Sequence, residues 1–247
     1  MRILKDKVEI QTSLEEKIKH EVELDEEAME MDILREIGSI GTGNAATALS
    51  ELIQQKISVD VLDLHIVPPI QVPDILGLGN MPAIVVYEPL PGDAGCDMLL
   101  VFERDEVKKL LSIMMQASFG SEEVDEAMEA TAVEELGNIV LGAFLSAISD
   151  FTGLTLVPVP PKHKIEIFDA ILDGFLAKLC LQRKDAVLFK TRFKCGQEIA
   201  QGTLIVFFSE ELQKLLVQKS KEWIKAVSYT HLRAHETSLH LVCRLLL

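Results

Sequence analysis

The hydrophobic and polar positions of the chain change their period several times, and each change marks the expected start of another element. Apolar residues three and four apart predict a helix over about 25–40, and the β-branched run at 57–67 predicts a strand. Farther along, apolar runs at 83–90 and 96–102 flank the turn PGDAG, which predicts a hairpin of antiparallel strands. A helical pattern follows this hairpin and closes the first half of the chain.

The second half repeats the same order of patterns. A helical pattern over 125–150 leads into a β-branched run at 153–159, and a hairpin of 186–193 and 202–208 turns around Gly196 before a closing helix. The segments that open the two halves also align, since LREIGSIGTGNAATALSEL and VEELGNIVLGAFLSAISDF match at an offset of 99 residues. The chain is therefore expected to contain a duplicated unit of about 100 residues.

Two such copies predict one pseudo-twofold domain of the α+β class. Three strands from each copy would form a six-stranded, largely antiparallel sheet with the helices packed on it. We expect a charged leader at 1–24 and a single domain at 25–227, built from a first copy at about 25–120 and a second copy at 121–227. Residues 228–247 hold three of the six His and resemble translated cloning sequence, so we interpret them as a non-native tail.

Composition narrows the classes of function. Lys and Arg number 24 and Asp and Glu 39, a net charge of −15, and such an acidic surface disfavours nucleic-acid binding. The first residues, MRILKDKVEIQ, are charged, and no apolar run reaches the roughly 20 residues of a membrane helix, so we expect neither a signal peptide nor membrane insertion. The four Cys lack a C-x-x-C spacing, which favours free thiols and a cytoplasmic location.

Three local motifs have ordinary structural interpretations. Ser13 to Glu16 matches a capping box, which predicts the start of a short helix there. GTGNAA at 41–46 matches a dinucleotide fingerprint, but it follows a helical pattern rather than a strand, so we expect a Gly-rich helix break. A helix at about 167–181 carries an apolar stripe that predicts a core contact, with a partner surface as the alternative.

The helix that opens the second copy carries the candidate chemistry. Thr131, Glu135 and Asn138 are spaced i, i+4 and i+7, so they line one face of that helix. The opposite side is apolar and predicts core residues, namely Val133, Leu136, Ile139 and Val140. Gly137 lies between the polar residues, and a glycine inside a helix costs about 1 kcal/mol. It predicts either a ligand that approaches the backbone or close packing of the helix on the sheet.

These residues carry a family resemblance. Over roughly residues 28–220 the sequence resembles the CheC-type chemotaxis phosphatases, relatives of CheX and of the flagellar switch protein FliY, and it is most similar to CheC. The family's motif is Asp or Ser, three residues, Glu, two residues, Asn, and a Pro after 21 or 22 more. The second copy has Thr131, Glu135, Asn138 and, after 22 intervening residues, Pro161. Thr in the first position keeps a small hydroxyl.

The resemblance implies an enzyme and its partners. It implies hydrolysis of the aspartyl phosphate of a phosphorylated CheY-type response regulator, with Asn138 placing the attacking water and Glu135 pairing with a Lys of the regulator. Pro161 would stiffen the neighbouring segment. The chain would need no cofactor of its own, because the regulator carries the Mg²⁺, and this agrees with the isolated His20, His65 and His163. The deamidase CheD is a further implied partner.

The first copy matches the motif less well. Asp32 and Glu36 occupy the first two positions, but Ser39 replaces the Asn and Leu62 stands at the position of the Pro. We therefore predict one competent site, in the second copy, and a degenerate site in the first. Two alternatives remain at this point. One is a weakly active or inactive homologue that binds CheD or CheY as an adaptor. The other is a FliY-like switch component, which is disfavoured because only one helix and the tail follow Phe208.

Overall fold

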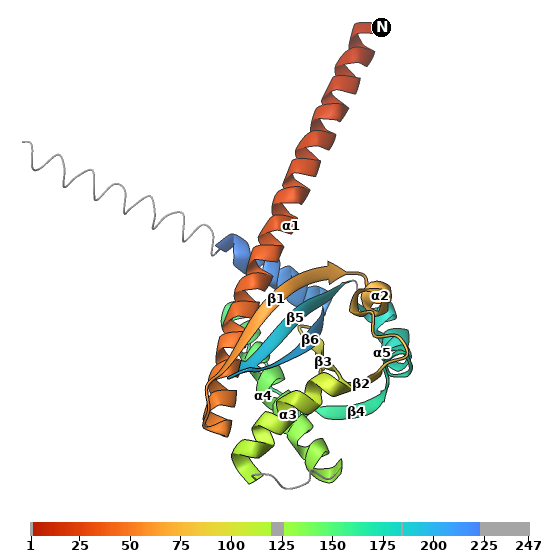
Figure 1. Cartoon of the computed structure of the whole chain (residues 1–247). Coiled ribbons are helices and arrows are strands. Elements are labelled where there is room, and N and C mark those ends of the chain that lie inside the picture. Colours follow the sequence, from red (N-terminus) through yellow and green to blue (C-terminus); the bar gives the residue numbers. More distant parts are fainter. Residues whose placement is uncertain (1, 120–125, 184, 223–247) are drawn as a thin grey trace, which may run out of the picture. The chain divides into compact units, whose positions relative to one another are not determined.

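The computed structural model describes residues 2–119, 126–183 and 185–222 (Figure 1). It divides into two units, one made of Met1–Leu34 with Leu215–Leu247 and one made of Arg35–Lys214. The described part of the first unit is helical. All the strands that the structure describes lie in the second unit. The predicted tail at 228–247 lies outside the described residues.

The second unit is built on one six-stranded sheet, in the order β1-β5-β6-β3-β2-β4, and all five pairings are antiparallel. The strands are β1 (Ile57–Val67), β2 (Pro82–Leu90), β3 (Cys96–Glu103), β4 (Lys162–Ile167), β5 (Ala186–Cys195) and β6 (Glu198–Phe208). The order is symmetric between the copies: replacing β1, β2 and β3 by β4, β5 and β6, and the reverse, gives the same strand order read from the other edge. The first strand of each copy pairs with the second strand of the other, so the copies interlock, and the predicted α+β fold is confirmed.

Helices cover both faces of the sheet, because neighbouring strand residues point to opposite sides. On one face, Leu99, Leu188 and Ile205 form a core with α2 (Val72–Leu76) and α5 (Phe168–Gln182), which lie together in Figure 1, and the short η1 (Pro69–Gln71) leads into α2. The stripe on α5 is therefore a core contact. The other face meets α1 (Arg2–Ile53, from residue 35 on) and α4 (Glu126–Thr152). The remaining named helix is α3 (Arg104–Phe119), and an unlabelled helix spans 210–222.

Helix α4 is rich in apolar residues. Its Glu129–Thr152 stretch is long and apolar enough to cross a membrane on length and composition alone, a property that core helices share. In this structure apolar side chains of α4 pack in the protein core, and Leu136, Val140 and Phe144 are fully buried. The Phe144 ring lies 5.4 Å from the Phe189 ring of β5, centre to centre. Its apolar character is that of a helix packed on a sheet.

Three sequence predictions were wrong at their boundaries. The strand expected at 153–159 is irregular chain, and β4 begins at Lys162 because Pro158, Pro160 and Pro161 have no N–H to donate to a ladder. The break expected at 41–46 is helical, since α1 continues to Ile53. The capping box at Ser13 does not start a helix, because α1 already begins at Arg2 and runs through it.

The continuity of α1 through GTGNAA has a packing reason. A Cβ at Gly41 would lie 2.8 Å from the ring of Phe144 on α4, so this glycine allows the two helices to approach closely. The Thr42 hydroxyl donates back to the Gly38 carbonyl at 2.8 Å, within the helix. These contacts keep residues 41–46 helical although two of them are glycines.

Candidate functional site

The candidate motif lies on the outer face of α4. Thr131, Glu135 and Asn138 are all exposed, whereas Val133, Leu136 and Val140 on the opposite side are buried and Ile139 is half-buried. The helix therefore presents a hydroxyl, a carboxylate and a carboxamide to solvent along one line, as the spacing predicts.

Gly137 fixes how deeply this helix sits on the sheet. A Cβ at Gly137 would overlap the side chain of Val86 on β2, so the backbone of α4 lies directly on that strand. Of the two interpretations of this glycine, close helix–sheet packing is therefore the one that the structure supports. The packing also sets the rotation of α4, and so the outward direction of Glu135 and Asn138, one turn apart on either side of it.

The first copy repeats this packing at the equivalent glycine. A Cβ at Gly38 of α1 would lie 3.1 Å from the ring of Phe189 on β5, and Phe189 corresponds to Val86 in the paired hairpins. Each site helix thus rests on the second strand of the other copy. Glu36 and Ser39 are exposed on this part of α1, while Asp32, also exposed, lies in the first unit.

A buried carboxylate holds the segment that leads to Pro161. Glu88 lies on β2, two residues after Val86, and only 1% of its surface is exposed. Its Oε1 accepts a hydrogen bond of 3.0 Å from the backbone N–H of Val159. Burial raises the pKa of Glu88, and the hydrogen bond from Val159 opposes that rise. Pro161, two residues farther on, is half-buried.

A second link joins the same segment to the site helix. His163 on β4 lies with its Nδ1 2.9 Å from Oε1 of Glu134, the residue before Glu135. His163 is therefore not isolated, and neither is His65, which pairs with Asp63 at 2.8 Å. Within the residues that the structure describes, no group of three or more His, Cys, Asp or Glu side chains is arranged to hold a metal ion.

Sequence reasoning missed both links. The signal for Glu88 was present, since AIVVYEPL places one acidic residue on the same strand face as Ile84 and Val86. Its partner Val159 lies 71 residues away and could not be identified from the sequence. His163 gave no signal, because its pairing depends on β4 lying beside α4.

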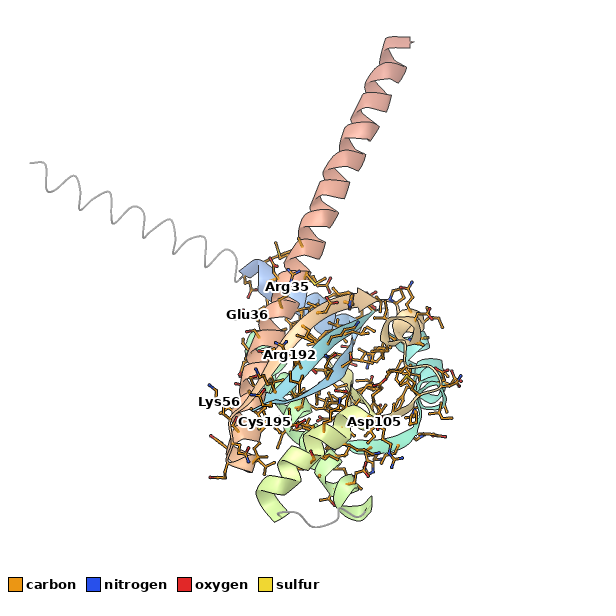
Figure 2. All side chains as sticks on the ribbon, in the orientation of Figure 1. Arg35, Glu36, Lys56, Asp105, Arg192 and Cys195 are labelled. Carbon is orange, nitrogen blue, oxygen red and sulfur yellow. The ribbon has the colours of Figure 1, made fainter. Side chains whose placement is uncertain are left out.

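In the first copy, a groove lies at the place that corresponds to the His163–Glu134 contact of the second copy. A groove of about 640 Å³ lies between α1 and β1, and its lining includes Arg35, Ser39, Leu62 and Leu64. At the 99-residue offset these four residues correspond to Glu134, Asn138, Pro161 and His163. Figure 2 labels Arg35 and Glu36 on α1, and Arg192 on β5, whose side chain pairs with Asp60 of β1 at 3.2 Å.

The pairing of the strands supports this correspondence. Val67 of β1 and Glu166 of β4 are equivalent at the 99-residue offset. Val67 lies opposite Ala186 of β5, and Glu166 lies opposite Ala83 of β2, so the two strands pair in the same register. In the first copy the ladder continues past a bulge at Leu62 to Ile57. In the second copy it stops at Lys162, opposite Tyr87. The chain before β4 therefore leaves the sheet, whereas its counterpart before the bulge remains a strand.

Comparisons with known proteins agree with this arrangement. A model of the CheC-like family matches residues 29–61 and 128–165. The second range contains all four motif positions, and the first ends one residue before Leu62. The chain is 29% identical over 164 residues to "CheY-P phosphatase CheC" of Bacillus subtilis (strain 168), covering 66% of this chain and 78% of that protein.

Over these two ranges the chain is similar to the CheC-like family. It is also 26% identical over 201 residues to "Flagellar motor switch phosphatase FliY" of the same organism, and the match covers 78% of this chain and 51% of that protein. The resemblance drawn from the motif is thus confirmed.

Solved structures show the same fold. Thermotoga maritima FliY superposes with a TM-score of 0.61 at 23% identity, over 78% of this chain and 96% of that one. The FliM middle domain from H. pylori superposes with a TM-score of 0.54 at 11% identity, over 77% and 97%. At these identities the likeness concerns the fold alone.

Proposed function

We propose that this CheC-like chain acts in chemotaxis as a phosphatase that hydrolyses the aspartyl phosphate of a CheY-type response regulator. The relation to CheC and FliY supports the chemotaxis role. The observation that carries the catalytic proposal is the exposure of Glu135 and Asn138 on one face of α4, which Gly137 holds on the sheet. The site is a protruding helix face rather than a deep pocket, as suits a protein substrate.

The proposed chemistry needs few groups from this chain. An acyl phosphate is already activated, so attack requires a water held in line with the scissile P–O bond. The water oxygen forms a bond to phosphorus, the bond to the aspartyl oxygen breaks, and the products are a carboxylate, inorganic phosphate and a proton. The Asn138 carboxamide can accept a hydrogen bond from the water and donate one to a phosphoryl oxygen. Any Mg²⁺ beside the phosphate belongs to the regulator in this proposal.

The other motif residues position the two proteins. Glu135 pairs with a cationic side chain of the regulator and fixes its register on α4. The Thr131 hydroxyl lies one turn before Glu135 on the same face, and Pro161 stiffens the segment beside the helix. In the first copy the shorter Ser39 replaces Asn138, so we assign activity to the second copy alone. We also propose a cytoplasmic location, where the regulator would be met, and CheD as a further partner.

The test follows the decay of a phosphorylated CheY-type regulator with and without the chain. We expect the chain to accelerate the decay, and Asn138→Ala to lose about 100-fold of that acceleration because the water is no longer placed. Asn44→Ala, which changes an exposed Asn on α1, is the matched control and should keep the full rate. Unchanged decay across regulators, with or without CheD, would overturn the phosphatase, and regulator binding retained in that case would indicate an adaptor.

A further inference from the structure

The segment between α4 and β4 is held in place although it has left the sheet. Its pairing with β2 ends at Lys162, and three of the four residues at 158–161 are prolines without an N–H. Val159 is the one residue among the four that can donate from its backbone, and Glu88 accepts that hydrogen bond at 3.0 Å. A buried side chain thus replaces the strand ladder at this point.

The chemistry of Glu88 is unusual for a purely structural position. Burial of a carboxylate is unfavourable, and an apolar residue of similar size would fill the same space at a lower cost. The hydrogen bond that it accepts is instead the contact that satisfies the single N–H of the segment, that of Val159. Glu88 also lies two residues from Val86, the side chain on which the site helix rests. It therefore ties the segment to the strand that supports Glu135 and Asn138.

The pair His163–Glu134 holds the other end of the segment. It joins β4 to α4 at 2.9 Å, one residue away from Glu135. Pro160 and Pro161 lie between the two attachment points, Val159 and His163. The prolines are therefore fixed to β2 on one side and to the site helix on the other.

In the first copy, different side chains occupy the positions that make the two attachments. Thr191 occupies the position of Glu88, and its hydroxyl donates instead to the Gly202 carbonyl of the neighbouring strand β6, at 2.9 Å. Arg35 and Leu64 occupy the positions of Glu134 and His163, and both line the open groove. The two copies thus differ in the support of the helix face as well as in the motif residue Asn138.

We infer that Glu88 is a positioning residue of the second-copy site, and that with His163 it holds the Pro161 segment as a fixed wall beside Asn138. The inference rests on the proposed phosphatase function. The wall would meet the docked regulator and keep the water and the scissile bond in line, so its loss should affect the chemical step more than docking.

The test combines kinetics with amide exchange in the free protein. Glu88→Leu removes the acceptor, and we expect exchange of the Val159 amide to rise by about tenfold, the order of magnitude that one hydrogen bond contributes. With phosphorylated regulator as substrate, kcat should fall by about tenfold while KM changes by less than about twofold. Glu88→Gln keeps a carbonyl acceptor and should restore both values, and Thr191→Val is the matched change in the first copy and should alter neither.

A second variant protects the test against a folding defect. His163→Ala breaks the other attachment near the surface, and it should lower kcat several-fold with the fold intact. Faster Val159 exchange with unchanged kcat in both variants would overturn the positioning role, as would a fall in kcat that Glu88→Gln does not restore. A wild-type chain without phosphatase activity would refute the proposed function. The amide-exchange result would still report on the attachment of Val159, because exchange is measured without the regulator.

Discussion

At Gly137 the backbone of the site helix lies directly on Val86 of β2, with no room for a side chain. In Gly137→Ala the new methyl would overlap Val86, so we expect a loss of about 1–3 kcal/mol in the free energy of unfolding. Gly142→Ala, in the same helix, meets no atom within 4 Å and should gain about 0.5–1 kcal/mol from the better helix former. Urea unfolding of both variants measures the difference, and equal midpoints would show that α4 does not rest on Val86.

The raised pKa of Glu88 predicts how the stability of the protein changes with pH. Burial raises its pKa in the folded state above the ordinary value of 4.5. Its contribution to stability is therefore fully present below the unfolded pKa and is lost as the pH rises through the folded pKa. The nearby Cys96 thiol stays neutral in this range, since burial raises its pKa to about 12.

Glu88→Gln removes this titration, so the wild type should lose stability relative to Glu88→Gln as the pH rises from about 4 to 7. Urea unfolding of both proteins across this range measures the relative stability. A difference that grows in favour of the wild type with rising pH would contradict the burial of an ionisable Glu88.

At the scale of elements, the sequence predicts correctly those features that depend on neighbouring residues. The two hairpins and the helix face shared by Glu135 and Asn138 follow from residue spacing, and the structure contains them. The predictions are wrong where a contact between residues far apart in the sequence determines the element. The helix continues through Gly41 because Phe144, a hundred residues later, packs against it. β4 begins at Lys162 and not at the β-branched residues before it, because the prolines among those residues have no N–H for the ladder.

The attachments of the Pro161 segment could not be predicted for the same reason. Glu88 and Val159 belong to different copies and meet only because the copies exchange their first strands. In the first copy, Thr191 replaces Glu88 and Leu64 replaces His163. Restoring the motif residue alone should therefore not restore a site.

We predict that Ser39→Asn, made in the Asn138→Ala background, regains less than about a tenth of wild-type phosphatase activity, because the wall beside the helix is still missing. The decay of phosphorylated regulator measures this directly. Recovery to the wild-type rate would show that the Asn alone distinguishes the two copies, and that the attachments contribute nothing to catalysis.

At the scale of the whole sheet, the interlocked order makes the copies dependent on each other. Each copy's first strand pairs with the other copy's second strand, so neither copy alone can complete its ladder. Fragments 25–120 and 121–227 should each lack cooperative unfolding when expressed separately, and should regain a native-like circular dichroism spectrum when mixed. Cooperative unfolding of either fragment as a monomer would contradict the exchange of strands.

The asymmetry between the copies is tested most directly by one comparison of rates. Phosphoryl loss from a phosphorylated CheY-type regulator would be followed with the wild type, Asn138→Ala and Ser39→Ala under identical conditions. We predict that Asn138→Ala falls to nearly the spontaneous rate of the regulator, whereas Ser39→Ala keeps the wild-type rate. A wild-type rate with Asn138→Ala, or an equal loss with Ser39→Ala, would contradict a single catalytic site on α4.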